Sequence, residues 1–120
     1  MKPYTNKEQS KRLSEILPLE SADQTWEIIA IAGDNLDVLE GMKYWHNGNT
    51  PYFLNSKLGV PCWSLAALLE VLLHPSLCDT SGEWRCQCYK EDHIVATAYA
   101  DNPVDACVKM VLKLKEKDLL

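Results

Sequence analysis

Residues 83–100 read EWRCQCYKEDHIVATAYA, and this stretch decides the fold. Apolar residues at the even positions up to Cys88 alternate with mostly polar residues at the odd positions, which is the period of a half-buried strand. A second run of mainly apolar residues follows over 94–100, after a short polar loop. The pattern predicts an antiparallel hairpin with strands over 83–90 and 94–100.

The length of the hairpin loop determines which residues face the core. A three-residue loop over 91–93 pairs Lys90 with Ile94. On that register the inner face collects the most apolar residues: Trp84, Cys86, Cys88, Ile94, Ala96 and Ala98. A two-residue loop shifts the pairing by one and turns another set inward: Val95, Thr97 and Tyr99. We prefer the three-residue loop because its inner face is the more apolar one.

Two helices are expected before the hairpin. The first, over about 6–17, begins with a capping-box pattern in which Thr5 is the N-cap and Glu8 stands at N3. The second, over about 64–74, can be capped by Ser64 and is apolar almost all round. A helix of that composition is expected to be buried on most of its sides.

A third helix and a possible third strand complete the expected elements. The helix covers about 103–118, with Asp101 or Asn102 as its N-cap and Pro103 in its first turn. The run 26–31 is apolar and rich in isoleucine, which favours a strand.

These elements predict an α+β fold in which helices pack on a small antiparallel sheet. The chain has 120 residues, 47% of them hydrophobic, enough for one core without a disulfide or metal. We therefore expect a single domain over 1–120. Its core is predicted to contain Trp26, Ile28, Leu65, Leu68, Leu69, Leu72, Trp84, Cys86, Ile94, Ala96, Cys107, Val108 and Val111.

The charge and cysteine content exclude several classes of protein. A net charge of -5 argues against nucleic-acid binding, which usually requires a basic face. The exception is the basic end of the last helix: Lys109, Lys113, Lys115 and Lys117. The N-terminus lacks the apolar part of a signal peptide, and no apolar run is long enough to span a bilayer. The odd number of cysteines, 5, argues against a disulfide framework, so we expect a cytoplasmic protein without membrane contact.

No enzyme motif is present, neither a phosphate-binding glycine loop, a nucleophile elbow nor a zinc-protease helix. The best metal candidates are Cys78, Cys86 and Cys88 with Cys107, His74 or His93. They lack the paired cysteine spacing of zinc sites. An acidic set lacks the spacing of a calcium loop: Asp34, Asp37, Glu40 and His46. We therefore predict no catalytic residue, no metal ligand and no cofactor.

The segment 34–53 has the least regular pattern and carries many aromatic and acidic side chains. Its apolar residues fall three apart, at Leu36, Leu39, Met42 and Trp45, which favours a short helix. Aromatic residues on loops are enriched at binding surfaces. The predicted binding residues are Tyr44, Trp45, His46 and Tyr52.

Three pieces of the chain carry a family resemblance: PCWSLAALLE at 61–70, with Trp84 on the strand, AYADNPVDA at 98–106, and TNKEQS at 5–10. These pieces resemble small uncharacterised proteins carried by phages and mobile elements of gut anaerobes. More distantly, the chain is similar to the phage ABA sandwich domain, in which a helix, a strand pair and a final helix follow this order. The resemblance implies an origin and an order of elements, and it implies no activity for any residue.

The function expected on these grounds is a small, non-catalytic, protein-binding accessory factor of phage or mobile-element origin. Its partner would be a host or phage protein, with homodimerisation open. One alternative is a nucleic-acid-binding module that uses the basic C-terminal helix. A second alternative is a metal-binding protein or small enzyme that uses the cysteines or the acidic segment.

Overall fold

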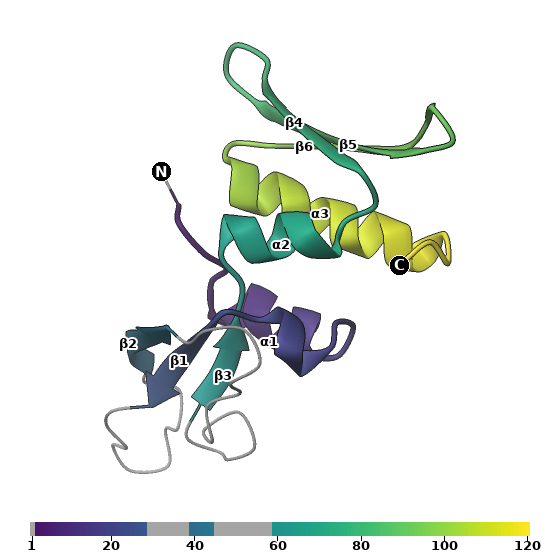
Figure 1. Cartoon of the computed structure of the whole chain (residues 1–120). Helices are drawn as coiled ribbons and strands as arrows, with labels where there is room; N and C mark the ends of the chain where they lie inside the picture. The colour runs from purple at the N-terminus through teal and green to yellow at the C-terminus, as the bar shows by residue number, and fades with distance from the viewer. Residues whose placement is uncertain (1, 29–38, 45–58) are drawn as a thin grey trace. The chain divides into compact units, whose positions relative to one another are not determined.

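The computed structural model describes residues 2–28, 39–44 and 59–120, and the side chains of 2–24 and 61–120 (Figure 1). The described residues form helices and small antiparallel sheets, which confirms the α+β class. The chain groups into two compact units. The C-terminal unit comprises Met1–Thr5 and Leu65–Leu120, and the N-terminal unit comprises Asn6–Ser64. The single-domain prediction stays a prediction, because compactness alone does not tell whether two units fold independently.

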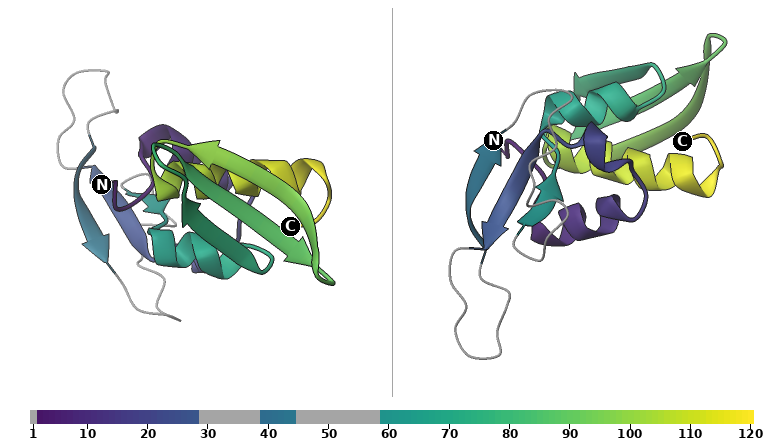
Figure 2. Two further views of the ribbon diagram at one scale, coloured as in Figure 1. Left: turned by 90° about the horizontal axis from the view of Figure 1, so that it is seen from above. Right: turned by 60° about the horizontal axis from the view of Figure 1, so that its bottom comes forward.

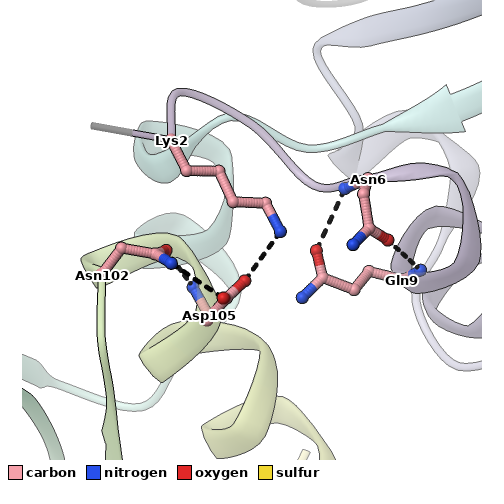
Figure 3. A network of polar contacts seen from close by, with 5 residues as sticks. All are labelled: Lys2, Asn6, Gln9, Asn102 and Asp105. Carbon is pink, nitrogen blue, oxygen red and sulfur yellow. Dashed lines mark hydrogen bonds and ion pairs between the residues drawn. The ribbon is translucent and has the colours of Figure 1, made fainter.

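The first helix of the N-terminal unit, α1, covers Lys7–Ser14, so it begins one residue later and ends three residues earlier than the predicted 6–17. Its capping box joins Asn6 and Gln9 (Figure 3). The Gln9 N–H donates to Asn6 Oδ1 at 2.8 Å, and the Asn6 N–H donates to Gln9 Oε1 at 3.0 Å. The predicted pair Thr5 and Glu8 is therefore wrong. Both Thr5 and Asn6 are good N-caps, so the sequence allowed two frames, and in the structure Thr5 is buried.

The sheet of the N-terminal unit has the order β2-β1-β3 and is antiparallel throughout. Its strands are β1 (Gln24–Ile28), β2 (Leu39–Tyr44) and β3 (Gly59–Cys62). The predicted strand over 26–31 is confirmed up to Ile28, and its last three residues lie outside the described ones. The expected short helix around Leu39 and Met42 is wrong, because residues 39–44 pair with β1 as a strand. Backbone pairing between strands prevailed over a weak helical spacing.

The end of β3 is fastened by polar contacts within the same unit. Trp63 is fully buried, and its Nε1 donates to Ser21 Oγ at 2.9 Å. The Ser64 N–H donates to Asp23 Oδ1 at 2.9 Å, and its hydroxyl donates to the same carboxylate. The bond to Ser21 gives the buried indole N–H the acceptor that it needs.

The C-terminal unit contains the second sheet, of order β4-β5-β6, and two helices. Its elements follow the chain order α2 (Leu65–Val71), β4 (Pro75–Asp79), β5 (Trp84–Lys90), β6 (His93–Ala100) and α3 (Pro103–Glu116). The helix α3 packs against β5 and β6, and α2 packs against α3 (Figure 2). Among the described residues, no helix has the length and apolar character needed to cross a bilayer.

The helix α2 is shorter than the predicted 64–74, because it ends at Val71. Proline disfavours the helical conformation at the residue before it, and His74, which precedes Pro75, adopts a φ of 41°. The chain then turns into β4, a strand that the sequence analysis missed. β4 pairs with β5 from Pro75, opposite Cys88, to Asp79, opposite Trp84.

The hairpin turn has two residues, so the predicted three-residue loop is wrong. Lys90 pairs with His93, and both turn residues, Glu91 and Asp92, have positive φ values of 51° and 65°. Such turns match the twist of paired strands. The pairing then shifts between Cys88 and Tyr89, which is a bulge that restores the predicted inner face. The matched pairs beyond the bulge are Cys88 with Ala96, Cys86 with Ala98 and Trp84 with Ala100.

The core of the C-terminal unit is built from small residues on the sheet and mostly larger apolar residues on α3. The sheet contributes Cys86, Cys88, Ala96, Ala98 and Ala100. The helix contributes Val104, Cys107, Val108, Met110, Val111 and Leu114. Small side chains on the strands leave room for the helix to lie close to the sheet, and the larger helical side chains fill the remaining space.

The predicted core is confirmed in most of its described positions. The buried members are Leu68, Leu72, Cys86, Ala96, Cys107, Val108 and Val111. Ile94 is a correction: it is 52% exposed, because it stands before the bulge and opposite Tyr89. Half-buried members are Leu65, Leu69 and Trp84. The side chains of Trp26 and Ile28 lie outside the described ones.

The start of α3 follows the predicted capping. Asn102 is the N-cap, and its Oδ1 accepts the N–H of Asp105 at 2.8 Å. Asp105 also accepts from Asn102 Nδ2 and from Lys2 Nζ, each at 2.8 Å (Figure 3). An acidic residue in the first turn stabilises the helix, because its negative charge lies near the positive end of the helix dipole. The ion pair therefore ties the N-terminal stretch to the start of α3 within the C-terminal unit.

Candidate functional site

The sheet of the C-terminal unit has one face turned away from α3, which we call the outer face. Side chains alternate between the two faces of a strand, so the outer face carries the residues next to the buried ones. Its cross-strand pairs are Arg85 with Tyr99, Gln87 with Thr97 and Tyr89 with Ile94, and β4 adds Ser76 and Cys78.

Two large apolar side chains of the outer face are exposed to solvent. Tyr99 is 47% exposed and Ile94 is 52% exposed. Between them, Gln87 Nε2 donates to Thr97 Oγ1 at 3.5 Å, and the Tyr89 hydroxyl donates to Gln87 Oε1 at 3.3 Å. These contacts link Tyr89 to Gln87 along β5 and Gln87 to Thr97 of β6. The outer face thus carries exposed aromatic and aliphatic side chains on either side of the polar pair Gln87 and Thr97.

Arg85 lies in the central strand of this face, directly between Cys78 of β4 and Tyr99 of β6. Its Nε atom is buried and has no hydrogen-bond partner. A guanidinium has five donors in a fixed plane and is normally matched to a carboxylate or phosphate. No described carboxylate pairs with it, not even that of Glu83 on the same strand side. Arg85 therefore presents a charge that the described part of the chain does not compensate.

Three lysines of α3, which we call the lysine row, donate hydrogen bonds to backbone carbonyls along the edge of β6. Lys109 Nζ donates to the Tyr99 carbonyl at 2.9 Å, and Lys117 Nζ donates to the Val95 carbonyl at 2.8 Å. Lys113 donates to the Thr97 carbonyl between them. Four helix residues rise about 6 Å and two strand residues about 6.6 Å, so an i, i+4 spacing matches alternate carbonyls.

The lysine row makes the β6 edge a poor template for another strand. An unprotected edge strand offers free backbone groups for pairing, and lysine is a common means of blocking it. The other edge, β4, is five residues long and begins with Pro75, which has no N–H to donate. The lysine row thus covers three carbonyls along the β6 edge, and Pro75 removes one N–H donor from the β4 edge.

We expect loss of the lysine row to destabilise the sheet edge and to promote self-association. Changing Lys109→Gln and Lys113→Gln together should lower the unfolding free energy by about 1 kcal/mol, because two charge-assisted bonds to the backbone are lost. The control pair Lys90→Gln and Lys115→Gln removes the same charge elsewhere. Light scattering and urea unfolding measure both effects. If both double variants had the same unfolding free energy and the same light scattering, the contacts of the lysine row would have no specific role at the sheet edge.

A cluster of thiols lies on the inner side of the sheet: Cys86, Cys88 and Cys107, all buried. A hydrogen bond with the Cys107 side chain, together with burial, raises the pKa of Cys86 to about 12. A hydrogen bond with Cys86, together with burial, also raises the pKa of Cys88. Thiolates are the nucleophiles and the metal ligands of cysteine chemistry, so these neutral thiols favour packing over reactivity.

The sequence-proposed metal sets receive no support from the described residues. No group of three or more histidine, cysteine or acidic side chains there is arranged to hold a metal ion. His74, His93 and Cys78 are exposed rather than gathered at the buried thiols. For the acidic set, Asp34, Asp37 and His46 lie outside the described residues, and the side chain of Glu40 is not among those described.

Native thiol labelling should separate Cys78 from the other cysteines. At pH 8 iodoacetamide should modify the exposed Cys78 first, because the raised pKa of Cys86 and Cys88 keeps those thiols protonated and burial shields them. Because folding raises the pKa of Cys86, the contribution of its neutral thiol to folding stability is complete below the ordinary thiol pKa of 9.0. That contribution is lost as the pH rises toward the folded-state pKa of about 12. Mass spectrometry of peptides measures the labelling. Modification of Cys86 as fast as Cys78 would contradict this burial.

The structure describes only one of the four binding residues predicted from the sequence, and only its backbone. Tyr44 is the last residue of β2, and its side chain is outside the described ones. Trp45, His46 and Tyr52 lie outside the described residues, so that site stays a prediction. The sequence analysis missed the outer face because it took the odd positions of 83–90 as an ordinary solvated side. The alternation of apolar and polar residues shows that the odd positions share one face. It does not show that this face differs from an ordinary solvated strand face.

Comparisons with protein-family models, with curated proteins and with solved structures give no match to this chain. The function is therefore argued from the described residues and their chemistry. The origin suggested by the resemblance of residues 61–70 and 98–106 to phage and mobile-element proteins remains part of the proposal below.

Proposed function

We propose that this protein is a non-catalytic protein-binding domain and that its partner docks on the outer face of the C-terminal sheet. The observation that carries the proposal is the combination of half-exposed Tyr99 and Ile94 with the unpaired Nε of Arg85. Tyrosine and arginine are enriched among residues that dominate binding energy. A tyrosine also offers a large contact area at small conformational cost.

The covered edge of β6 supports docking on the face over addition of a strand there. The lysine row occupies three carbonyls of β6. A partner therefore gains little from backbone pairing with β6 and more from covering the exposed side chains. In keeping with the resemblance to phage and mobile-element proteins, the proposed partner is a host or phage protein.

Nucleic-acid binding is the second candidate, and the lysine row is the observation in its favour. Its three ammonium groups follow one edge of a face that carries tyrosines, as in surfaces that stack bases beside a charged groove. Each ammonium is already bonded to a backbone carbonyl, however. Arg85 is the one basic residue among the paired outer-face positions, the exposed Glu83 lies two residues before it, and the chain carries a net charge of -5. These charges favour a protein partner.

Affinity capture with matched variants tests the proposed surface. Wild type, Tyr99→Ala with Ile94→Ala, and Leu120→Ala are compared; Leu120 is an apolar control with a similar exposure of 45%. We expect a protein captured by wild type and by the Leu120 variant to be lost with the double variant. Melting temperatures of all three should agree closely, because the replaced side chains are half exposed.

A second variant compares the outer face with the site predicted from the sequence. If Tyr44→Ala with His46→Ala abolishes capture and the outer-face variant does not, the binding surface belongs to the segment 34–53 and the proposal is wrong. Capture of nucleic acid in place of any protein would also exclude it. A gel shift at low salt, where phosphate contacts are strongest, detects that outcome.

A further inference from the structure

We infer that two copies of this chain associate by pairing their β4 strands antiparallel, so that the sheets of two C-terminal units join into one. This inference goes beyond the proposed function, because it concerns an edge of the sheet and not its outer face. β4 is the edge strand on the side away from β6, and no described strand pairs with its other side (Figure 1). Its residues Ser76, Cys78 and Asp79 are exposed.

The hydrogen bond that closes the turn between β4 and β5 shows which backbone groups of β4 point away from the sheet. The Thr80 N–H donates to the Glu83 carbonyl at 2.8 Å. Backbone groups of successive strand residues point to opposite sides, and the register between β4 and β5 is regular. Cys78, two residues before Thr80, therefore has its N–H and carbonyl toward β5. Leu77 and Asp79 have theirs toward the open edge.

These outward groups match those of a second copy when a two-fold axis passes between the two Leu77 residues. Leu77 of each copy would donate to the Leu77 carbonyl of the other, and the Asp79 N–H of each copy would donate to the Pro75 carbonyl of the other. The missing N–H of Pro75 then lies opposite the Asp79 carbonyl, which already accepts the Cys78 thiol at 3.6 Å. The pairing therefore gives each outward N–H of Leu77 and Asp79 an acceptor.

The charge of Asp79 favours this register over one centred on Cys78. Pairing centred on Cys78 would bring the two Asp79 carboxylates to diagonal positions on one face, within reach of each other. Pairing centred on Leu77 places the two Asp79 residues at opposite ends of the joined strands. It also sets the two half-buried Leu77 side chains opposite each other, and apolar pairs across strands stabilise a sheet.

The covered edge of β6 indicates that β4 pairs with a second β4 and that association stops at two copies. Three carbonyls of β6 accept the ammonium groups of the lysine row, so β6 of another copy is a poor partner. Residues 74–84, which contain β4, include no lysine or arginine. Pairing of β4 with β4 uses the same strand on both copies and closes as a dimer, whereas pairing of β4 with β6 would grow into a filament.

Sedimentation velocity and amide exchange test the association in the unchanged chain. A strand of five residues makes a small interface, so a weak dimer should form as the concentration rises from about 10 µM to about 1 mM. Over that range, NMR should show several-fold slower exchange of the Leu77 and Asp79 amides. The Cys78 amide points toward β5 and is the internal control. A chain that stays monomeric, or a Leu77 exchange rate independent of concentration, would overturn the inference.

Substitutions at Leu77 separate the backbone bond from the side chain. Leu77→Pro removes the N–H that donates to the second copy, and pairing with β5 does not use this N–H. It should therefore weaken the association by about tenfold or more. Leu77→Ala keeps the N–H and should weaken the association less. Melting temperatures show whether both variants fold. Equal association constants for wild type and a folded Leu77→Pro would contradict the pairing.

Disulfide trapping tests the register without changing the backbone of β4, so it holds even where Leu77→Pro does not fold. The proposed pairing places Ser76 opposite Cys78 of the second copy, with Cα atoms about 4.5 Å apart, within disulfide range. The two Cys78 residues are diagonal, about 7–8 Å apart. With oxidised glutathione, Ser76→Cys should form a covalent dimer about tenfold faster than wild type. Ser76→Cys with Cys78→Ser should be as slow as wild type. Equal rates for Ser76→Cys and wild type would overturn this register.

The outcome is separate from that of the proposed function. A dimer that is lost with Leu77→Pro and kept with Tyr99→Ala and Ile94→Ala supports pairing of β4, whatever partner the outer face captures. A dimer that is kept with Leu77→Pro and lost with the outer-face variant would overturn the inference, because the copies would then meet through their outer faces.

Discussion

Replacing Trp63 with alanine should lower the free energy of unfolding by about 3–5 kcal/mol, the largest single effect expected in this chain. Trp63 is fully buried, and alanine would leave a cavity where the indole packs. The substitution also removes the donor to Ser21 Oγ, at 2.9 Å in the structure. Urea unfolding followed by circular dichroism measures the change.

Trp63→Phe is the matched control, since it keeps much of the buried ring and removes the indole N–H. Its cost should be clearly smaller than that of alanine. A loss below about 1 kcal/mol for Trp63→Ala would contradict the observed burial, because surface substitutions usually stay within that range.

Replacing Leu68 with alanine should cost about 2–5 kcal/mol. Leu68 lies in α2, is fully buried, and belongs to the helix that packs against α3. The half-buried Leu69 is the control on the same helix, and Leu69→Ala should cost less. Thermal and urea unfolding of both variants give the comparison. Equal losses would show that the faces of α2 are assigned wrongly.

The inner face of the hairpin could be predicted from the sequence, although its turn could not. Alternation of apolar and polar residues over 83–90 marks the face that must be buried. The three-residue loop was inferred by assuming regular pairing from the turn onward. The structure combines a two-residue turn with a bulge between Cys88 and Tyr89, and these two departures from regular pairing cancel at the pair Cys88 and Ala96. Ile94, which lies between turn and bulge, is the residue for which they do not cancel.

Short elements depended on partners that local sequence does not reveal. β4 has five residues, begins with proline and shows no clean alternation, so it becomes a strand only because β5 lies beside it. β2 shows a helical spacing in the sequence and is nevertheless paired with β1. The capping frame of α1 was ambiguous for a different reason: adjacent residues Thr5 and Asn6 are both good N-caps.

By itself the sequence determined the α+β class, the three helices, the strands of the hairpin and the burial of residues such as Leu68 and Val111, because periodicity and capping act locally. It could not determine the candidate site. Arg85 reads as a solvated strand residue, and Lys109 reads as part of a solvated helix face. Only the tertiary structure decided otherwise: pairing of three strands places Arg85 between neutral neighbours. Packing of α3 along β6 brings each ammonium of the lysine row to a carbonyl, since two periods of different origin happen to match along one edge.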